Sequence, residues 1–340
     1  MKEGPQANVV VSCRTRFARN LAGMPFPPRA KSIALQRVAE TVKAAIADCE
    51  RFREFFCVTI DAFGENDRHH LRESQVISQE MERGGEHRLV FIGADPITTI
   101  MVNEEDHLRV FVITPGLQME AALDALIQVE DDLANRLEFA FSEQFGYLTA
   151  CPTNTGTGLR ASVMLHLPGL ALTQEVDSIM QGIPNCGMAV RGIYGENSSP
   201  MGHFYQISNE TTLGETEEQI VRRLSELINQ VIEKEAEARD KLFSRQRALV
   251  EDKVFRAYSI LAQSRIINTQ EAIDHLSQLR LGIDHSLFTN LTHSGLNRLI
   301  VGVQPAHLQH KAGKPLPSEK RDVVRARLLR EALADVAINN

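Results

Sequence analysis

The chain has 340 residues, of which 43% are hydrophobic and 24% charged, and its formal net charge is -7. This composition is ordinary for a soluble globular protein of two or three domains. The negative charge argues against nucleic acid as the main partner, because phosphate backbones require an excess of Lys and Arg. The sequence contains no apolar run of about 18 residues that would predict a membrane span, and its N-terminus lacks a signal-peptide pattern.

Five cysteines occur along the chain, an odd number, and none of them forms a Cys-x-x-Cys pair. This pattern fits reduced thiols better than a disulfide framework or a zinc site. We therefore expect a cytoplasmic protein without nucleic-acid or membrane partners.

Short apolar runs predict the strands of a mainly antiparallel sheet. A buried strand is expected at 8–12. Three β-branched runs separated by turn or charged residues predict an antiparallel meander at 88–92, 97–102 and 108–113. A strand or loop follows around 147–166, with further strands expected at 190–193 and 204–208.

Apolar residues at helical spacing predict helices at 32–47 and 117–138. A third helix should begin at a capping box formed by Thr216 and Gln219. Its apolar stripe comprises Ile220, Leu224, Leu227, Ile228 and Val231.

The character of the sequence changes after about residue 240, where charged helical patterns dominate. We therefore predict an α+β domain at 1–240, in which helices flank a mainly antiparallel sheet. A smaller helical domain is expected at 241–340. The boundary is soft, because the helix that begins near Thr216 can run through it.

Two arginines lie two positions apart directly after the first predicted strand. Arg14 and Arg16 would point to the same face of an extended segment. Two guanidinium groups on one face can grip phosphate oxygens bidentately. A solvated strand end is the alternative interpretation.

Three consecutive acids, Glu104, Glu105 and Asp106, precede Arg109. Taken alone, this segment fits a polar turn. A metal site is a second possibility, but contiguous acids rarely converge on one ion without the spacing of a calcium loop.

A segment of small residues with two glycines runs from Cys151 to Ser162. Such residues let the backbone approach a ligand closely. Arg160 lies near its end, but the Gly-Lys-Ser/Thr ending of a Walker A loop is missing. Cys151 fits either a reactive thiol or a small buried side chain.

Five segments, in order and wording, resemble the ATP:guanido phosphotransferase family, which includes creatine kinase and arginine kinase. They are Ser-Cys-Arg-Thr-Arg-Phe-Ala-Arg-Asn from 12, Asn-Glu-Glu-Asp-His-Leu-Arg from 103, Cys-Pro-Thr-Asn-Thr-Gly-Thr-Gly-Leu-Arg-Ala-Ser-Val from 151, Arg-Gly-Ile-Tyr-Gly-Glu from 191 and Gln-Ile-Ser-Asn from 206. The wording at 147–149 and 164–168, with Arg-Asp-Val-Val-Arg-Ala from 321, resembles the bacterial protein-arginine kinases more closely.

The resemblance implies that ATP is bound with Mg²⁺, the ion being held by phosphate oxygens and water rather than by a protein metal site. Five arginines would cradle the phosphates: Arg14, Arg16, Arg109, Arg160 and Arg191. His70 matches a nucleotide-contacting histidine of the family loosely, and a surface histidine fits equally well.

The resemblance also implies an acceptor site for a guanidinium group. Glu105 and Glu196 would clamp this cation and draw off a proton. Cys151, as a thiolate, would face a non-reacting nitrogen, its pKa lowered by nearby arginines. Relatives read Gly-Glu-Gly-Ser-Glu-Ala around the second glutamate, whereas Ser199 and Pro200 stand here, which bears on loop mobility and rate.

The tail motif carries a further implied site. Arg321 and Arg325 are four apart and share a face of the predicted helix, with Asp322 beside them. The resemblance implies that the two arginines clamp the phosphoryl group of phosphoarginine, while Asp322 accepts hydrogen bonds from the attached guanidinium. A solvated helix face is the alternative.

We therefore expect a protein-arginine kinase that acts on proteins with exposed arginines and marks them for the stress response or proteolysis. The resemblance implies a homodimer, allosteric control by phosphoarginine, an McsA-like activator and a ClpC-type protease system. A phosphagen-type kinase for free arginine is one alternative, disfavoured by the expected absence of the N-terminal helical domain of such enzymes. A phosphoarginine-binding adaptor with a vestigial kinase half is another, disfavoured by the retained carboxylates, cysteine and arginines.

Overall fold

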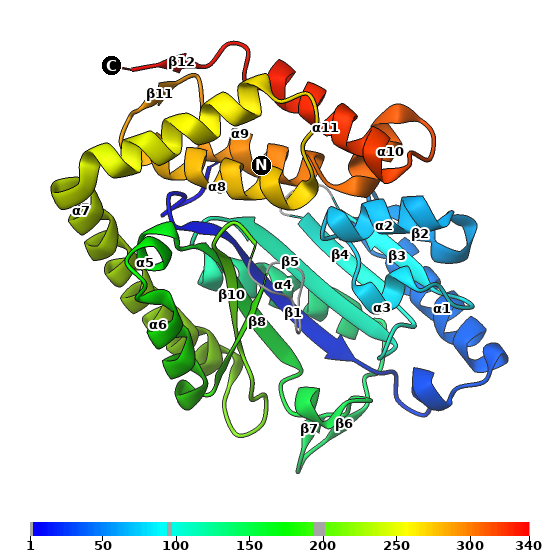
Figure 1. The fold of residues 1–340 in the computed structure, drawn as a ribbon. Helices are drawn as coiled ribbons and strands as arrows, with labels where there is room; N and C mark the ends of the chain where they lie inside the picture. Colours follow the sequence, from blue (N-terminus) through cyan, green and yellow to red (C-terminus); the bar gives the residue numbers. More distant parts are fainter. Residues whose placement is uncertain (1–2, 94–96, 193–200, 340) are drawn as a thin grey trace.

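A single eight-stranded sheet forms the centre of the computed structural model, which describes residues 3–93, 97–192 and 201–339 (Figure 1). All neighbouring strands are antiparallel. From one edge to the other the strands are β2 (Phe56–Thr59), β3 (Leu89–Ile92), β4 (Ile97–Val102), β5 (Leu108–Pro115), β1 (Val10–Arg19), β8 (Leu159–His166), β10 (Phe204–Asn209) and β9 (Met188–Gly192).

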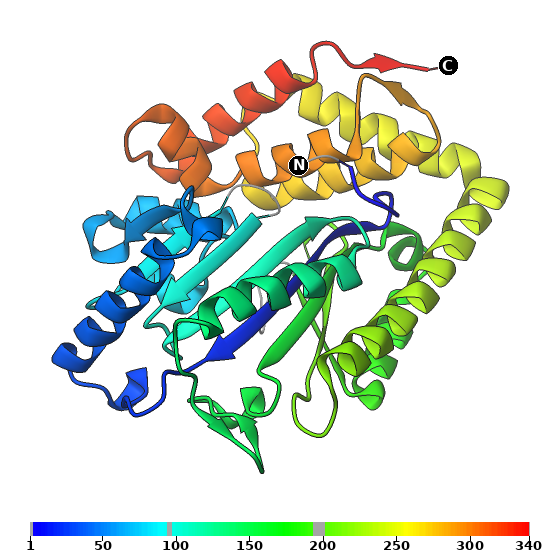
Figure 2. The ribbon, with the colours of Figure 1, turned by 180° about the vertical axis from the view of Figure 1, so that it is seen from behind.

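Three long helices cover one face of this sheet (Figure 2). They are α1 (Ser32–Ala47), α4 (Met119–Ala134) and α7 (Glu217–Gln263). Strand β1 shows why the face is apolar, because alternate side chains such as Cys13 and Phe17 are buried toward the helices. Thr15, on the same face, donates a hydrogen bond to the backbone oxygen of Ala122 at 2.8 Å.

A pair of short helices covers part of the opposite face, and α7 packs against a second pair that follows β8. Helices α2 (Glu65–Glu73) and α3 (Gln79–Glu82) lie over β2 to β5, where Met81 and Phe111 belong to a separate apolar cluster. Helices α5 (Pro168–Leu172) and α6 (Val176–Gly182) follow β8, and a small hairpin, β6 (Phe141–Ser142) with β7 (Gly146–Tyr147), precedes it. Single 3-10 turns span Pro27–Arg29, Glu50–Phe52, Ile60–Ala62, Pro152–Asn154 and Ile183–Cys186.

The C-terminal region is helical and has its own apolar core. It contains α8 (Thr269–Asp284), α9 (His293–Gly302), α10 (Pro305–Ala312) and α11 (Ser318–Ala332), with a two-stranded pair of β11 (Phe288–Thr289) and β12 (Ala337–Ile338). Helix α7 links it to the sheet and has a non-helical residue, Gln246, at a kink. Figure 1 shows this region lying across one end of the sheet.

The predicted fold class is confirmed: the sheet is antiparallel and flanked by helices, and a helical region follows. The capping box of Thr216 and Gln219 is also present, and it begins α7. Helix α7 runs past residue 240 and kinks at Gln246, so no loop marks the predicted domain boundary. Nothing in the described part of the chain forms a helix with the length and apolar run needed to cross a bilayer.

Two predicted boundaries were wrong. The first strand, expected at 8–12, begins at Val10 and extends to Arg19. Its second half was missed because arginines alternate there with buried residues, so the segment has the composition of a polar loop. It is nevertheless a central strand that pairs with β5 on one side and β8 on the other. The helix expected at 117–138 is shorter, since α4 ends at Ala134.

Candidate active site

The register of the sheet brings five arginines to one face. Arg16 on β1 lies opposite Arg160 on β8. Arg14 is two residues away on the same face, and Arg109 on β5 lies opposite Ala18, again two residues from Arg16. Arg191 on β9 lies opposite Gln206 on β10, which lies opposite Met164 on β8. Since directly paired residues share a face, Arg191 lies on the same face as the other arginines. Strand alternation and the pairing register together therefore bring the arginines of the motifs to one face.

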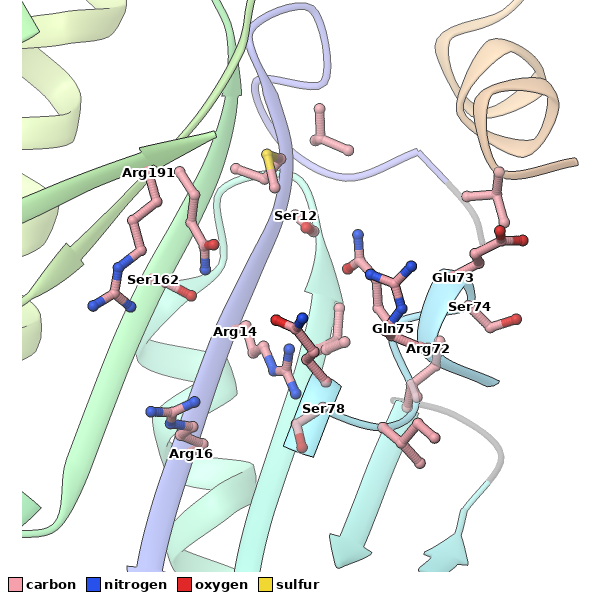
Figure 3. Close-up of a pocket in the computed structure, with 18 of the residues that line it drawn as sticks. Ser12, Arg14, Arg16, Arg72, Glu73, Ser74, Gln75, Ser78, Ser162 and Arg191 are labelled. Carbon is pink, nitrogen blue, oxygen red and sulfur yellow. The ribbon is translucent and has the colours of Figure 1, made fainter. Parts of the chain in front are cut away.

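These arginines line a cavity of about 1100 Å³ between the sheet, α2 and the C-terminal region. Figure 3 shows Arg14, Arg16 and Arg191 on the same side of the sheet as Ser12 and Ser162, which also line the cavity. This volume is slightly above the usual range for ligand pockets, and the cavity is large enough for a nucleotide.

Charge makes this face unusual. Burial, and then the neighbouring charge of Arg109, lowers the pKa of Arg14 to about 10. Burial, followed by the charges of Arg109 and Arg160, lowers the pKa of Arg16 well below its ordinary value. The guanidinium of Arg14 lies 3.9 Å from the centre of the Phe111 ring, and its Nε has no hydrogen-bond partner among the described residues. Converging desolvated cations of this kind favour a bound polyanion.

The three consecutive acids diverge after the turn between β4 and β5. Glu104 is buried and pairs with Arg109 at 2.7 Å. Asp106 is also buried, and it accepts hydrogen bonds of 2.6 Å from the Asn20 side chain and from the Ala150 backbone. The segment is thus the polar turn between β4 and β5, in which Glu104 faces Arg109 while Asp106 faces Asn20 and Ala150.

Glu105 is the acid that lines the cavity while remaining partly exposed. Its Oε2 lies 3.2 Å from Arg109 Nη2. Burial raises the pKa of Glu105, an effect that the positive charge of Arg109 opposes. The carboxylate therefore stands beside the arginine face and is open to a second cation.

The loop that carries Cys151 is fixed by hydrogen bonds on both sides. Thr149 Oγ1 donates to the Cys151 backbone oxygen at 2.7 Å, and Thr212 Oγ1 donates to the Thr155 oxygen at 2.7 Å. Gly156 has a φ of +116°, and a Cβ there would lie 2.2 Å from the Thr212 oxygen, so glycine is required. Cys151 Sγ lies 3.0 Å from Thr153 Oγ1, and both residues line the cavity.

Other cavity residues were not found from the sequence. Arg72, Gln75 and Ser78 line it from the α2–α3 segment, and Asn297 and Arg298 line it from α9. The two groups are more than 200 residues apart in the sequence and carry no recognisable motif. Only the packing of the C-terminal region against the sheet brings them together.

His70 lies elsewhere. Its ring stacks on His310 with centroids 4.4 Å apart and touches His307 at 4.2 Å, both on α10. It is not among the residues that line the cavity within the described chain. His70 was expected to contact a nucleotide base. Its place against α10 does not support that prediction, which stays untested.

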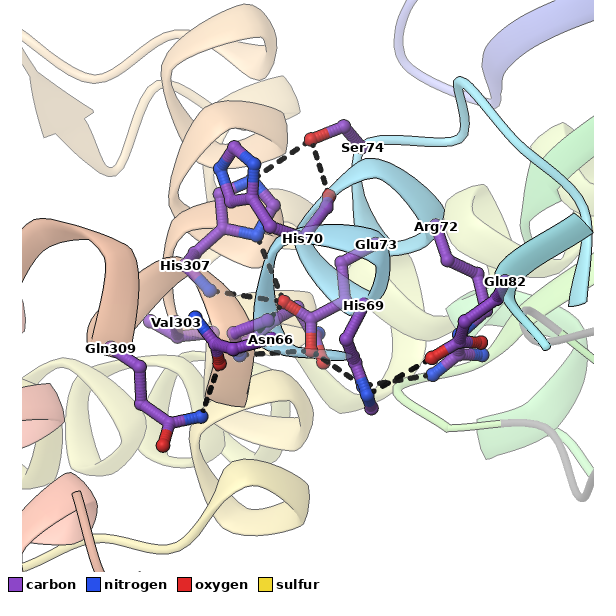
Figure 4. A network of polar contacts seen from close by, with 12 residues as sticks. Asn66, His69, His70, Arg72, Glu73, Ser74, Glu82, Val303, His307 and Gln309 are labelled. Atoms are coloured by element: carbon purple, nitrogen blue, oxygen red, sulfur yellow. Dashed lines mark hydrogen bonds and ion pairs between the residues drawn. The ribbon is translucent and has the colours of Figure 1, made fainter. Parts of the chain in front are cut away.

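A buried carboxylate joins α2 to α10 beside the cavity (Figure 4). Glu73 accepts hydrogen bonds from the backbone nitrogens of Ala306 and His307 at 3.1 Å, and lies 2.9 Å from His307 Nδ1. A carboxylate at a helix N-terminus is favourable because it meets unpaired N–H groups and the positive end of the dipole. His307 also bonds Ser74, and both line the cavity, so the C-terminal region forms part of its wall.

The predicted phosphoarginine residues lie together on α11, but they differ in exposure. Arg325 is only 1% exposed, and it donates to the backbone oxygens of Val303 and Ile267 at 2.8 and 2.9 Å and to Asp322. Arg321 donates to the Leu316 oxygen at 3.2 Å and is only partly buried. Arg325 therefore holds the C-terminal region together, whatever else it does.

Glu196, Ser199 and Pro200 lie outside the described residues. The described residues also contain no group of three or more His, Cys, Asp and Glu side chains placed to hold a metal ion.

Comparisons with known proteins cover almost the whole chain. The family model "ATP:guanido phosphotransferase, C-terminal catalytic domain" matches residues 37–238, and "Protein-arginine kinase McsB C-terminal domain" matches 247–340. A relative named protein-arginine kinase from Pelotomaculum thermopropionicum is 39% identical over 339 residues, which is 99% of this chain and 95% of the relative. Another of the same name from Moorella thermoacetica is 42% identical over 334 residues, covering 97% and 95%.

Solved structures agree on the fold. A lombricine kinase superposes with a TM-score of 0.61 at 24% identity, over 68% of this chain and 67% of that one. The duplicated taurocyamine kinase from Schistosoma mansoni, with bound transition-state analogue components, gives 0.59 at 28% identity over 67% and 33%. Together with the matched sequence segments, these likenesses place the chain in the ATP:guanido phosphotransferase family, among the protein-arginine kinases.

Proposed function

We propose that this kinase transfers the γ-phosphoryl group of ATP to the guanidinium group of arginine side chains in other proteins. The observation that carries the proposal is the convergence of five arginines on one sheet face, with the Glu105 carboxylate beside them. A cationic floor suits a polyanion, and an adjacent carboxylate suits a cationic acceptor. Few other reactions require both at one cavity.

The arginines would hold and align the triphosphate. ATP carries about four negative charges, and phosphoryl transfer depends on positioning and charge neutralisation more than on covalent chemistry. Arg14 and Arg16 lie at the centre of the face, where their unneutralised charges are most desolvated. Mg²⁺ bound to ATP would supply further neutralisation of the phosphates.

The acceptor guanidinium would lie at the end of the cavity formed by Glu105 and the Cys151 loop. Glu105 would orient the guanidinium through paired hydrogen bonds and accept a proton from the attacking nitrogen, a role that Glu196 would share. Cys151 would contact a nitrogen that does not react. The raised pKa of Glu105 brings this group closer to the range useful for a general base.

A turnover assay with ATP and an arginine-containing protein tests the proposal. We expect phosphoarginine in the product by mass spectrometry and a loss of about 100-fold or more in turnover in Glu196→Ala, with ATP affinity retained. Near-normal phosphorylation by the variant would refute the role of Glu196. Efficient phosphorylation of free arginine with none of protein would favour the phosphagen-type alternative.

The phosphoarginine site on α11 remains a second proposal, supported by the partial exposure of the neighbouring residues Arg321 and Asp322. Its test should avoid Arg325, because that side chain anchors the fold. We expect Arg321→Ala to weaken phosphoarginine binding by calorimetry while thermal stability and phosphoryl transfer to peptides are retained. Unchanged binding would refute the assignment.

The cellular setting is proposed from the likeness to protein-arginine kinases alone. We expect a cytoplasmic homodimer that participates in the stress response, works with an McsA-like activator and hands substrates to a ClpC-type protease. Copurification of the tagged full chain from its own cells, before and after heat stress, would test these partners. Sedimentation velocity would test the dimer.

A further inference from the structure

The β6–β7 hairpin is fixed firmly beside the Cys151 loop. The Tyr147 backbone pairs with Gly156 of that loop, with the Tyr147 nitrogen donating at 2.8 Å. The Tyr147 ring lies 3.5 Å from the guanidinium of Arg19, which is buried and paired with Glu130 at 2.5 Å. Figure 1 shows the hairpin projecting below the sheet, at the end away from the C-terminal region. The hairpin is therefore attached to both the sheet and the loop.

Large apolar side chains are exposed on and beside this hairpin. Phe141 is 59% exposed, Phe145 47% and Leu213 57%. Phe141 rests edge-on against the Tyr147 ring at 5.3 Å. Leu213 lies over the loop, because a Cβ on Gly156 would come within 3.0 Å of its Cα. Aromatic and apolar groups clustered beside a binding site and left exposed are typical of interaction surfaces.

The charge around the hairpin is opposite to that of the cavity floor. Segments 137–159 and 201–221, which form the hairpin, the Cys151 loop and the Leu213 loop, contain no Lys or Arg. Glu138, Glu143 and Glu210 are exposed on them. This surface therefore repels phosphate groups and complements a polypeptide that carries a positive charge.

We propose that Phe141, Phe145 and Leu213 form a docking rim for the substrate polypeptide on both sides of the target arginine. The inference rests on the proposed function. An arginine that reaches Glu105 and Cys151 leaves its backbone and its neighbours at the edge of the cavity, next to the hairpin. The occupant is an extended or locally unfolded segment with apolar residues near the arginine, because the rim offers apolar contacts and negative charge but no deep pocket.

Two peptides and two variants test the rim. One peptide carries Leu and Phe on both sides of a single arginine, and the other carries Gly and Ser there. We expect the wild-type chain to phosphorylate the apolar peptide about 10-fold more efficiently, mainly through a lower KM. In the triple variant Phe141→Ser, Phe145→Ser, Leu213→Ser this preference should disappear, while kcat/KM for the Gly/Ser peptide is retained. Phe56→Ser is the matched control, because Phe56 is 65% exposed on β2, a strand remote from β8 in the sheet order.

Each other outcome overturns the inference in a distinct way. No preference in the wild-type chain means that the rim does not bind substrate. An equal loss for both peptides in the triple variant means that the hairpin only supports the Cys151 loop. A change from dimer to monomer in sedimentation velocity means that a second copy of the chain occupies the rim. If the wild-type chain phosphorylates neither peptide, the proposed function itself fails.

Discussion

Two groups of arginines in this chain differ in what surrounds them. In the C-terminal region and its contact with the sheet, Arg239, Arg280 and Arg325 are buried and donate hydrogen bonds to backbone oxygens and polar side chains. On the sheet face, Arg14 and Arg16 are partly buried in the cavity wall, and among the described residues neither has a carboxylate partner in an ion pair.

The difference separates two uses of the same side chain. An arginine that donates to several backbone and side-chain oxygens holds segments of the fold together, and its removal leaves those oxygens unsatisfied. An arginine that is desolvated beside other arginines destabilises the free protein, and a bound anion reverses this effect. The hydrogen-bond partners therefore distinguish the two uses.

The largest effect on stability should follow loss of the first kind of arginine. We expect Arg325→Met to lower the free energy of unfolding by about 3–5 kcal/mol, because Asp322 and two backbone oxygens lose their donor. Urea denaturation of the full chain measures this. A loss below about 1 kcal/mol would mean that Arg325 is not needed for stability, and would support a role for it in binding phosphoarginine.

A somewhat smaller effect, confined to catalysis, should follow a change beside the arginine face. We expect Glu105→Gln to lower turnover of a peptide about 100-fold, since the amide keeps the shape but cannot take up a proton. ATP affinity should stay within about threefold. In the wild-type chain, activity should decline as the pH falls through the raised pKa of Glu105. Retained turnover in the variant would remove Glu105 from the catalytic set.

The smallest effect concerns the contact between α2 and α10. Burial, then the charges of His307 and His310, lowers the pKa of His70, and Glu73 and Asp67 oppose this. The unfolded chain therefore binds the proton more readily, so the contribution of His70 to stability declines as the pH falls below about 6.5. Solvent screening keeps the expected change to a fraction of 1 kcal/mol.

His70→Asn provides the comparison for this effect. Its unfolding free energy should depend less steeply on pH between 7 and 5 than that of the wild-type chain. Parallel pH profiles would show that the ring pair with His310 is not sensitive to protonation.

The sequence predicted that Arg14 and Arg16 share a face, because strand alternation is local. Arg109 and Arg160 join them through the pairing of β1 with β5 and β8, which lie far from β1 in the chain, and only the family resemblance had grouped these arginines. The arrangement of the acids was not predictable in the same way. Glu104 and Asp106 turn toward different partners after a tight turn, which contiguity in the sequence does not reveal.

The contributions of distant segments could not be predicted. Asn297 and Arg298 line the cavity only because α9 packs across the end of the sheet. The spacing of Arg321 and Arg325 correctly indicated a shared helix face, but spacing cannot show which of them is buried against Val303 and Ile267. The nucleotide contact of His70 was likewise predicted from the family resemblance, whereas its position depends on packing against α10.

One variant tests the central claim that the sheet face is built to hold the phosphates of ATP. Arg16→Met should weaken ATP binding at least about 100-fold by calorimetry, because a desolvated cation at the centre of the face is lost. The same variant should unfold at the same urea concentration as the wild-type chain or a higher one, since repulsion from Arg109 and Arg160 is relieved. Unchanged ATP affinity together with a loss of stability like that expected for Arg325→Met would contradict the claim.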